Sequence, residues 1–256
     1  MATALSHFLV PLLIVPLVCA AGASSPPASE TTKSPEAPKP IIVVVGGVGG
    51  LENLKLGLQL ALHLAGLDAE VHNFEWTHGK GRIIKDLQDT RNHADKTDEL
   101  VRELRRLKAD APDRPLYLVG RSGGTVLALG AAARFPPQSF ERIILLSPAI
   151  SPTFDLSPAL RATRRELVAF CSDLDWFVLG FGTQQFGTAD RYYSSSAGLK
   201  GFVPPPDATP ETEELYRRLV QVHWTPSMIL HGHTGGHIGP TLPTFLASDV
   251  VPWLKP

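Results

Sequence analysis

The stretch LYLVGRSGGTVLAL, residues 116–129, decides the fold of this chain. Its apolar first half is typical of a buried β-strand, and its second half, rich in small residues, is typical of a helix. Between them lies a G-x-S-x-G sequence with Ser122 at its centre. The motif by itself is short and common, but a position between a strand and a helix predicts a sharp turn that exposes the serine hydroxyl, a nucleophile elbow.

The glycines around the serine fit this turn. We expect Gly120, Gly123 and Gly124 to stand where a Cβ atom would collide with neighbouring chain. The N–H of Gly123 would lie at the start of the helix, where free donors and the helix dipole favour an oxyanion. The alternative is an ordinary strand-to-helix turn in which Ser122 only caps the helix.

On these residues the chain resembles the α/β-hydrolase superfamily over residues 41–256. The resemblance implies an α/β fold, with a mostly parallel central sheet and helices on both faces. It also implies a serine nucleophile, an acid and a histidine in that chain order, and two oxyanion-hole amides. The chain is compact for this family and has no room for a large inserted cap domain.

Length and composition set the remaining limits. A chain of 256 residues with 43% apolar residues suits one α/β domain with a sizeable core. Its 24 basic and 25 acidic residues give a formal net charge of -1, so no overall field attracts nucleic acid. We therefore expect no nucleic-acid partner.

The N-terminus differs in kind from the rest. Residues 8–21 form a nearly continuous apolar run that ends in small residues, which predicts a secretory signal peptide over residues 1–23. Residues 24–40 are rich in Pro, Ser and Thr and predict a linker. The domain over residues 41–256 would then be secreted, periplasmic or in the cell envelope. A retained anchor, or a lipid on Cys19, would instead keep it close to a membrane.

The first predicted strand, residues 41–45, is five β-branched residues and reads as buried on both faces. A glycine loop, a helix over about 51–65 and a strand over about 69–74 complete a βαβ unit. A dinucleotide-binding G-x-G-x-x-G would need glycine where Glu52 stands, so that fingerprint is broken. The family resemblance implies instead that Val48 or Gly49 supplies the second oxyanion-hole amide. A tight helix entry without a chemical role is the alternative.

Periodicity predicts the rest of the domain. Charged and apolar residues alternate at helical spacing before the elbow strand, and apolar runs alternate with helices after it. The expected elements are helices over 92–108, 211–222 and 242–254, and strands over 142–147, 167–171 and 227–230.

The acid is expected just beyond the strand over 167–171, which is where the family resemblance places it. Asp175 is the first choice, because the apolar residues after it would shield it from water. Asp173 is the alternative acid, and Asp155, after the preceding strand, is a third candidate. The acid would hold the histidine in one tautomer and stabilise its charged form.

The histidine is expected in the loop HGHTGGHIG, residues 231–239. His237 resembles the late glycine-flanked histidine of the family, with His233 and His231 as alternatives. Three closely spaced histidines also suit a metal site, but no Asp, Glu or Cys lies beside them in the sequence to complete one. We expect no metal and no organic cofactor.

The sequence thus predicts a serine hydrolase in which Ser122, His237 and Asp175 cleave a carboxylic ester or related acyl bond of a small molecule. Residues 180–206, with several aromatic side chains, suit a short lid or an acyl-binding wall, and equally the ordinary packing of a long loop. Two other classes stay open. One is a binding module that keeps the fold without turnover, and the other is an acyltransferase of the cell envelope.

Overall fold

The computed structural model describes residues 38–50 and 54–255. The chain divides into two compact units, Met1–Glu36 and Ala37–Pro256, and the described residues belong to the second. The predicted signal peptide and most of the predicted linker lie outside the described residues. Within those residues, no helix has the length and apolar character needed to cross a membrane.

A single parallel sheet organises the described residues. Its order is β2-β1-β3-β4-β5-β6, and all five neighbouring pairs run parallel. The mostly parallel α/β sheet is therefore confirmed. The strands are β1 Ile41–Val45, β2 Glu70–Phe74, β3 Leu116–Arg121, β4 Arg142–Leu146, β5 Leu167–Cys171 and β6 Leu219–His223.

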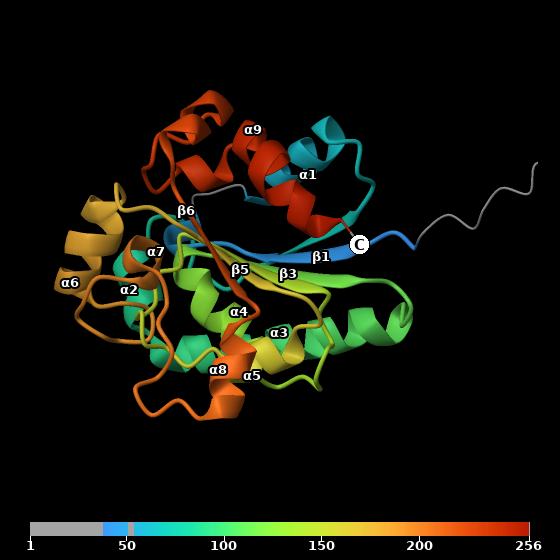
Figure 1. Cartoon of the computed structure of the whole chain (residues 1–256), viewed down its shortest axis with the longest axis horizontal. Helices are drawn as coiled ribbons and strands as arrows, with labels where there is room; N and C mark the ends of the chain where they lie inside the picture. Colours follow the sequence, from blue (N-terminus) through green and yellow to red (C-terminus); the bar gives the residue numbers. More distant parts are fainter. Residues whose placement is uncertain (1–37, 51–53, 256) are drawn as a thin grey trace, which may run out of the picture. The chain divides into compact units, whose positions relative to one another are not determined.

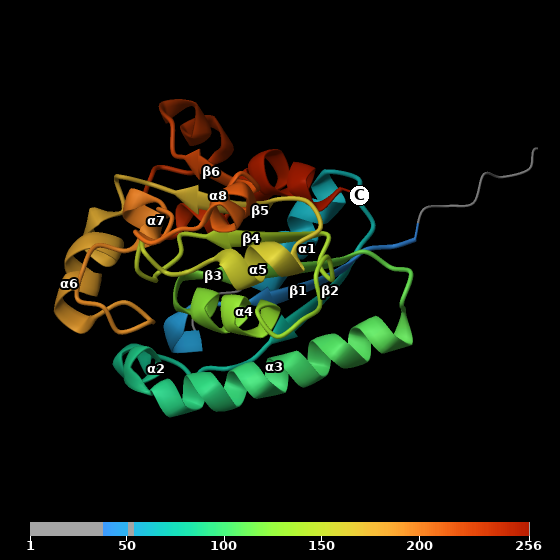
Figure 2. The ribbon, with the colours of Figure 1, turned by 60° about the horizontal axis from the view of Figure 1, so that its bottom comes forward.

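Helices cover both faces of the sheet (Figures 1 and 2). Along each strand, successive side chains point to opposite faces of the sheet. Val43 and Leu118 therefore belong to one core, and their neighbours Val44 and Val119 belong to the other. The first core packs under α3 Thr90–Asp110, α4 Thr125–Ala132, α5 Ser157–Ala162 and α8 Pro210–Tyr216, and the second under α1 Leu54–Leu64 and α9 Pro243–Phe245.

Burial explains why the first strand matched its prediction. Every residue of Ile41–Val45 is at most 2% exposed. Each such side chain contributes about 1.5–3 kcal/mol on burial. Continuous β-branched sequence is therefore used where both faces of a central strand are covered.

The order in which the chain adds strands to the sheet reverses between β1 and β3. From β1 it moves outward to β2, and from β3 it moves the other way, through β4 and β5 to β6. The carboxyl ends of β1 and β3 thus form a topological switch point, the place where open α/β sheets bind ligands. The short helices α2 Ile83–Gln88, α6 Thr183–Phe186 and α7 Ala197–Lys200 lie at this end of the sheet (Figures 1 and 2).

The last strand lies earlier in the sequence than predicted. The expected helix over 211–222 ends at Tyr216, and its last residues form β6. The expected strand over 227–230 is wrong, because Pro226–His231 is a 3-10 helix in which Leu230 is 86% exposed. The edge strand β6 is only partly buried, so its sequence lacks the continuous apolar run that marks β1.

Candidate active site

The elbow follows β3 as the sequence indicates. Ser122 has φ 51°, a left-handed conformation that non-glycine residues adopt only where the surroundings enforce it. A Cβ on Gly120 would lie 2.9 Å from the Cβ of Ala128, and one on Gly124 would lie 2.1 Å from the carbonyl oxygen of Gly46. The helix α4 therefore packs directly against the sheet, and this close approach fixes the serine at the switch point.

Three side chains from distant parts of the sequence form a hydrogen-bonded chain. The Oγ of Ser122 lies 2.9 Å from Nε2 of His237, and Nδ1 of His237 lies 2.6 Å from Oδ2 of Asp175. Ser122 follows β3, Asp175 follows β5, and His237 follows the 3-10 helix Pro226–His231. Ser122 and Asp175 are 4% and 3% exposed.

The hydrogen bonds determine the histidine tautomer. A carboxylate only accepts hydrogen bonds, so Nδ1 of His237 carries the proton and Nε2 is left to accept from the hydroxyl of Ser122. Burial lowers the pKa of His237 below its ordinary value, although the bond to Asp175 opposes this effect. The neutral imidazole that can accept a proton therefore persists to lower pH than in water.

The histidine loop is held by side chains that bind its carbonyl groups. Ser172 Oγ donates to the carbonyl of Gly235 at 2.6 Å, and Arg121 Nη2 donates to the carbonyl of His237 at 2.8 Å. Arg121 precedes the serine in the elbow, and Ser172 lies three residues before Asp175. The elbow and the acid loop thus each fix the loop of His237. Neither contact could be predicted from the sequence, because nothing local marks it.

The turn after β1 lies against the elbow. A Cβ on Gly123 would be 2.6 Å from Cγ1 of Val48, so the two predicted oxyanion-hole residues are neighbours. Among the described residues, no acceptor binds the N–H of Val48. Trp76 supports the turn through a hydrogen bond from its Nε1 to the carbonyl of Gly46, at 2.8 Å.

The expectation for Gly49 requires a correction. Its N–H donates to Oδ2 of Asp86 at 2.7 Å, so it is engaged with a protein carboxylate. Of the two predicted residues in this turn, Val48 remains the candidate for the second amide. The sequence did not reveal Asp86, which lies 37 residues further on in a polar stretch.

The two alternative acids, Asp173 and Asp155, do not contact His237. Asp173 is exposed, and Asp155 accepts a hydrogen bond from the N–H of Ser157 at the start of α5. The structure therefore brings Asp175, and neither alternative, to His237.

The other two histidines of the loop are also apart from the serine. His233 is 3% exposed and its Nδ1 accepts from the N–H of Gly235 at 3.1 Å. His231 pairs through Nδ1 with Asp249 at 2.7 Å. Within residues 38–50 and 54–255, no group of three or more His, Cys, Asp or Glu side chains could hold a metal ion.

Exposed apolar residues lie next to the acid and the histidine in the chain. Leu174 and Trp176, which flank Asp175, are 50% and 63% exposed, and Ile238, next to His237, is 70% exposed. In the predicted lid or wall, the segment over 180–206, Tyr192 and Tyr193 are exposed and Phe202 is buried. Exposed apolar side chains thus adjoin two of the three candidate residues in the sequence.

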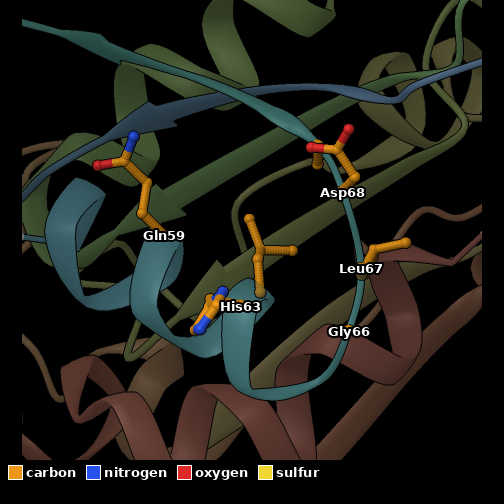
Figure 3. Close-up of a pocket in the computed structure, with 7 residues that line it drawn as sticks. Gln59, His63, Gly66, Leu67 and Asp68 are labelled. Atoms are coloured by element: carbon orange, nitrogen blue, oxygen red, sulfur yellow. The ribbon is translucent and has the colours of Figure 1, made fainter.

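A separate pocket lies away from the serine. It is lined by residues at the end of α1 and in the connection to β2, and Figure 3 shows Gln59 and His63 extending from α1. This connection leads into the amino end of β2, whereas Ser122 follows the carboxyl end of β3. The pocket is not part of the candidate active site.

The parallel sheet, the elbow at the switch point and the hydrogen-bonded serine, histidine and aspartate define an α/β hydrolase. The family described as serine aminopeptidase, S33, a hydrolase family, matches residues 36–191, which is more than half of the chain. The chain belongs to this family. The matched residues include the elbow and Asp175 but end before His237.

Several solved structures are similar to the chain. TT1662 from Thermus thermophilus is 17% identical, with 87% of this chain and 92% of that chain covered and a TM-score of 0.49. A cutinase-like protein from Cryptococcus sp. is 13% identical, with 85% and 96% covered and a TM-score of 0.42. A cutinase from Trichoderma reesei is 13% identical, with 85% and 77% covered and a TM-score of 0.38. A comparison with curated protein sequences gives no significant match.

Proposed function

We propose that this protein is a serine hydrolase that cleaves carboxylic ester or related acyl bonds of small molecules through an acyl-enzyme. The observation that carries the proposal is the continuous hydrogen-bonded chain from Ser122 through His237 to Asp175, with distances of 2.9 and 2.6 Å. A nucleophile, a base and a group that orients the base are the parts that acyl transfer requires.

In the first half of the reaction, Nε2 of His237 takes the proton of Ser122 as Oγ attacks the substrate carbonyl. Asp175 holds the imidazole in the required tautomer and stabilises the imidazolium that forms. The amides of Gly123 and Val48 donate to the oxyanion of the tetrahedral intermediate. His237 then returns the proton to the departing alcohol.

In the second half, water replaces the alcohol. His237 removes a proton from the water as it attacks the acyl-enzyme, and the same amides hold the second oxyanion. Ser122 regains its proton when the acid product leaves. The described residues supply every proton transfer in this scheme.

The surroundings favour an apolar acyl or alcohol group. Leu174, Trp176 and Ile238, which are next to the acid and the histidine in the chain, are exposed apolar residues. An aminopeptidase, the activity in the family's description, must also bind a substrate ammonium group, for which a carboxylate is the usual partner. Asp175 is committed to His237 and does not serve this purpose. The exposed apolar side chains next to the acid and the histidine in the chain lead us to favour esters over peptides.

The test is labelling with a fluorophosphonate, followed by mass-spectrometric mapping of the labelled peptide. The domain over residues 38–256 and its Ser122→Ala variant are compared, with thermal unfolding as the control for folding. We expect covalent label at Ser122 and none in the variant. Folded protein that takes no label would support the binding-module alternative instead.

Substrate panels then separate the remaining alternatives. We expect turnover of p-nitrophenyl esters and little turnover of aminoacyl p-nitroanilides. Slow hydrolysis that is strongly accelerated by an added alcohol or amine acceptor would support an acyltransferase. Secretion or attachment to the cell envelope remains a prediction from residues 1–23, which fractionation of expressing cells would test.

A further inference from the structure

Asp86 is a fully buried carboxylate that the triad does not use. It lies on α2 and is 0% exposed. A buried carboxylate is costly unless hydrogen bonds replace its water. Its Oδ2 accepts from the N–H of Gly49 at 2.7 Å, and its Oδ1 accepts from the N–H of His78 at 2.8 Å. Oδ1 also lies 2.8 Å from Nδ1 of His78.

One of these bonds acts on the turn that carries Val48. Gly49 has φ 81° and ψ -1°, the values of the third residue in a type II turn, where glycine is favoured. The peptide between Val48 and Gly49 can face either way in a β-turn. In the observed orientation its N–H points to Asp86. In the flipped orientation the Val48 carbonyl oxygen would face the carboxylate, and two acceptors would repel.

The next peptide of the turn is fixed as well. The carbonyl of Gly49 accepts from the N–H of Gly81 at 2.9 Å, in the segment that leads to α2. A Cβ on Gly50 would lie 2.9 Å from Oγ1 of Thr77, so the segment over 77–86 packs closely on the turn. The turn therefore has little freedom on the side away from the serine.

On the side near the serine, Val48 contacts the elbow. Its Cγ1 lies only 2.6 Å from the position that a Cβ on Gly123 would take. Val48 is thus held between the elbow on one side and the Asp86 bond of the following amide on the other. Figure 2 shows α2 at the carboxyl end of the sheet, beside the turn after β1.

We propose that Asp86 is a positioning residue that fixes the Gly49 amide and so aims the preceding amide, that of Val48, at the reacting oxyanion. This inference rests on the proposed function. Oxyanion donors contribute most when they are aimed before the reaction begins, because no reorganisation is then needed in the transition state. Asp86 supplies that rigidity without touching the substrate.

The first test is Asp86→Asn. The amide has one acceptor oxygen, so it cannot satisfy both the N–H of Gly49 and the two donors of His78. One direct oxyanion donor is worth about 10²–10³ in kcat, so losing its positioning should lower kcat about 10-fold to 100-fold. The KM of a p-nitrophenyl ester should change little, because the oxyanion forms only in the transition state.

Asp89→Asn is the matched control. Asp89 lies three residues from Asp86 and its Oδ2 is 3.2 Å from Nε2 of His78, but it accepts at the start of α3, from the N–H of Asn92. The control removes the same charge and a contact to the same histidine, with no bond to the turn. We expect its kcat to stay close to that of the unchanged protein.

A second readout separates positioning from a general structural effect. Affinity for a trifluoromethyl ketone, which forms an oxyanion on Ser122, should fall in Asp86→Asn by the same factor as kcat. If Asp86→Asn does not fold, the smaller Asp86→Ser variant is measured in the same way. Unchanged kcat and ketone affinity in the folded variant would overturn the inference.

The proposed function can fail separately. If the unchanged protein takes no fluorophosphonate at Ser122, both the function and the inference are overturned. If it is labelled and Asp86→Asn is labelled at the same rate, the serine hydrolase stands and only the role of Asp86 is lost.

Discussion

Two histidines of the same loop, four residues apart, have opposite surroundings. Nδ1 of His237 donates to Asp175, and its Nε2 accepts from the hydroxyl of Ser122. His233 makes edge contacts with the rings of Trp224 and Phe245, and its Nδ1 accepts from a backbone N–H within its own loop. One imidazole joins a hydroxyl to a carboxylate, and the other packs among aromatic rings.

The two histidines differ in the charged groups that oppose the effect of burial on their pKa. Burial lowers the pKa of both histidines, because a charged imidazole loses its water. At His237 the carboxylate of Asp175 opposes that effect. At His233 only the more distant Asp249 does so, and the pKa falls to about 4. A histidine that accepts a proton needs a partner that stabilises its charged form. A histidine that only fills the interior of the loop needs no such partner.

The largest expected effect comes from replacing each of the two histidines, one at a time, by alanine. His237→Ala should lower kcat by about 10⁶-fold, because the triad acts as a unit, with little change in stability. His233→Ala should instead lower the free energy of unfolding by about 2–4 kcal/mol through the cavity it leaves. Ester hydrolysis per folded molecule and denaturant unfolding measure the two effects. Similar losses of activity in both variants would contradict the assignment of a catalytic role to His237 and a structural role to His233.

The second prediction concerns the charge partner of His237. Asp175→Asn should lower kcat by about 10⁴-fold, because the amide favours the wrong tautomer. Asp173→Asn is the matched control, since its side chain is exposed and two residues away. Its activity should equal that of the unchanged protein. Loss in Asp173→Asn with activity retained in Asp175→Asn would transfer the role of the acid.

The third prediction is a loss of stability in acid that comes from His233. Its pKa is about 4 in the folded chain against 6.5 in the unfolded chain, so the unfolded state binds the proton first as pH falls. Its contribution is therefore present above pH 6.5 and is lost between pH 6.5 and about 4. The loss would amount to about 3 kcal/mol.

The variant that tests this is His233→Asn, which keeps an acceptor for the N–H of Gly235 but does not titrate. Urea unfolding at several pH values should show a weaker decline below pH 6.5 than in the unchanged protein. An equal decline in both proteins would assign the acid sensitivity to other groups.

The smallest effect is on the pH profile of catalysis. In the proposed mechanism the free enzyme is active when His237 is neutral, and burial lowers the pKa of this histidine. The acid limb of kcat/KM should therefore lie below the ordinary histidine value of about 6.5. A limb above that value would mean that the charge of Asp175 outweighs burial at this site.

Much of the architecture could be predicted from the sequence. β1 and β5 lie where the apolar runs indicate, because a strand covered on both faces must be apolar at every position. The edge strand β6 was misplaced for the converse reason. Its Gln221 contacts the backbone of Phe202 through Oε1 and Nε2, so a polar residue is satisfied inside a strand.

The sequence by itself determined the serine elbow, because its glycines and its place between a strand and a helix are local properties. It also narrowed the acid and the histidine to short loops. Only the tertiary structure shows that Asp175 rather than Asp173 contacts His237, that His237 rather than His233 contacts Ser122, and that the Gly49 amide binds Asp86. Each of these choices depends on contacts between segments far apart in the chain, as with Asp86 and Gly49, and no local pattern records such contacts.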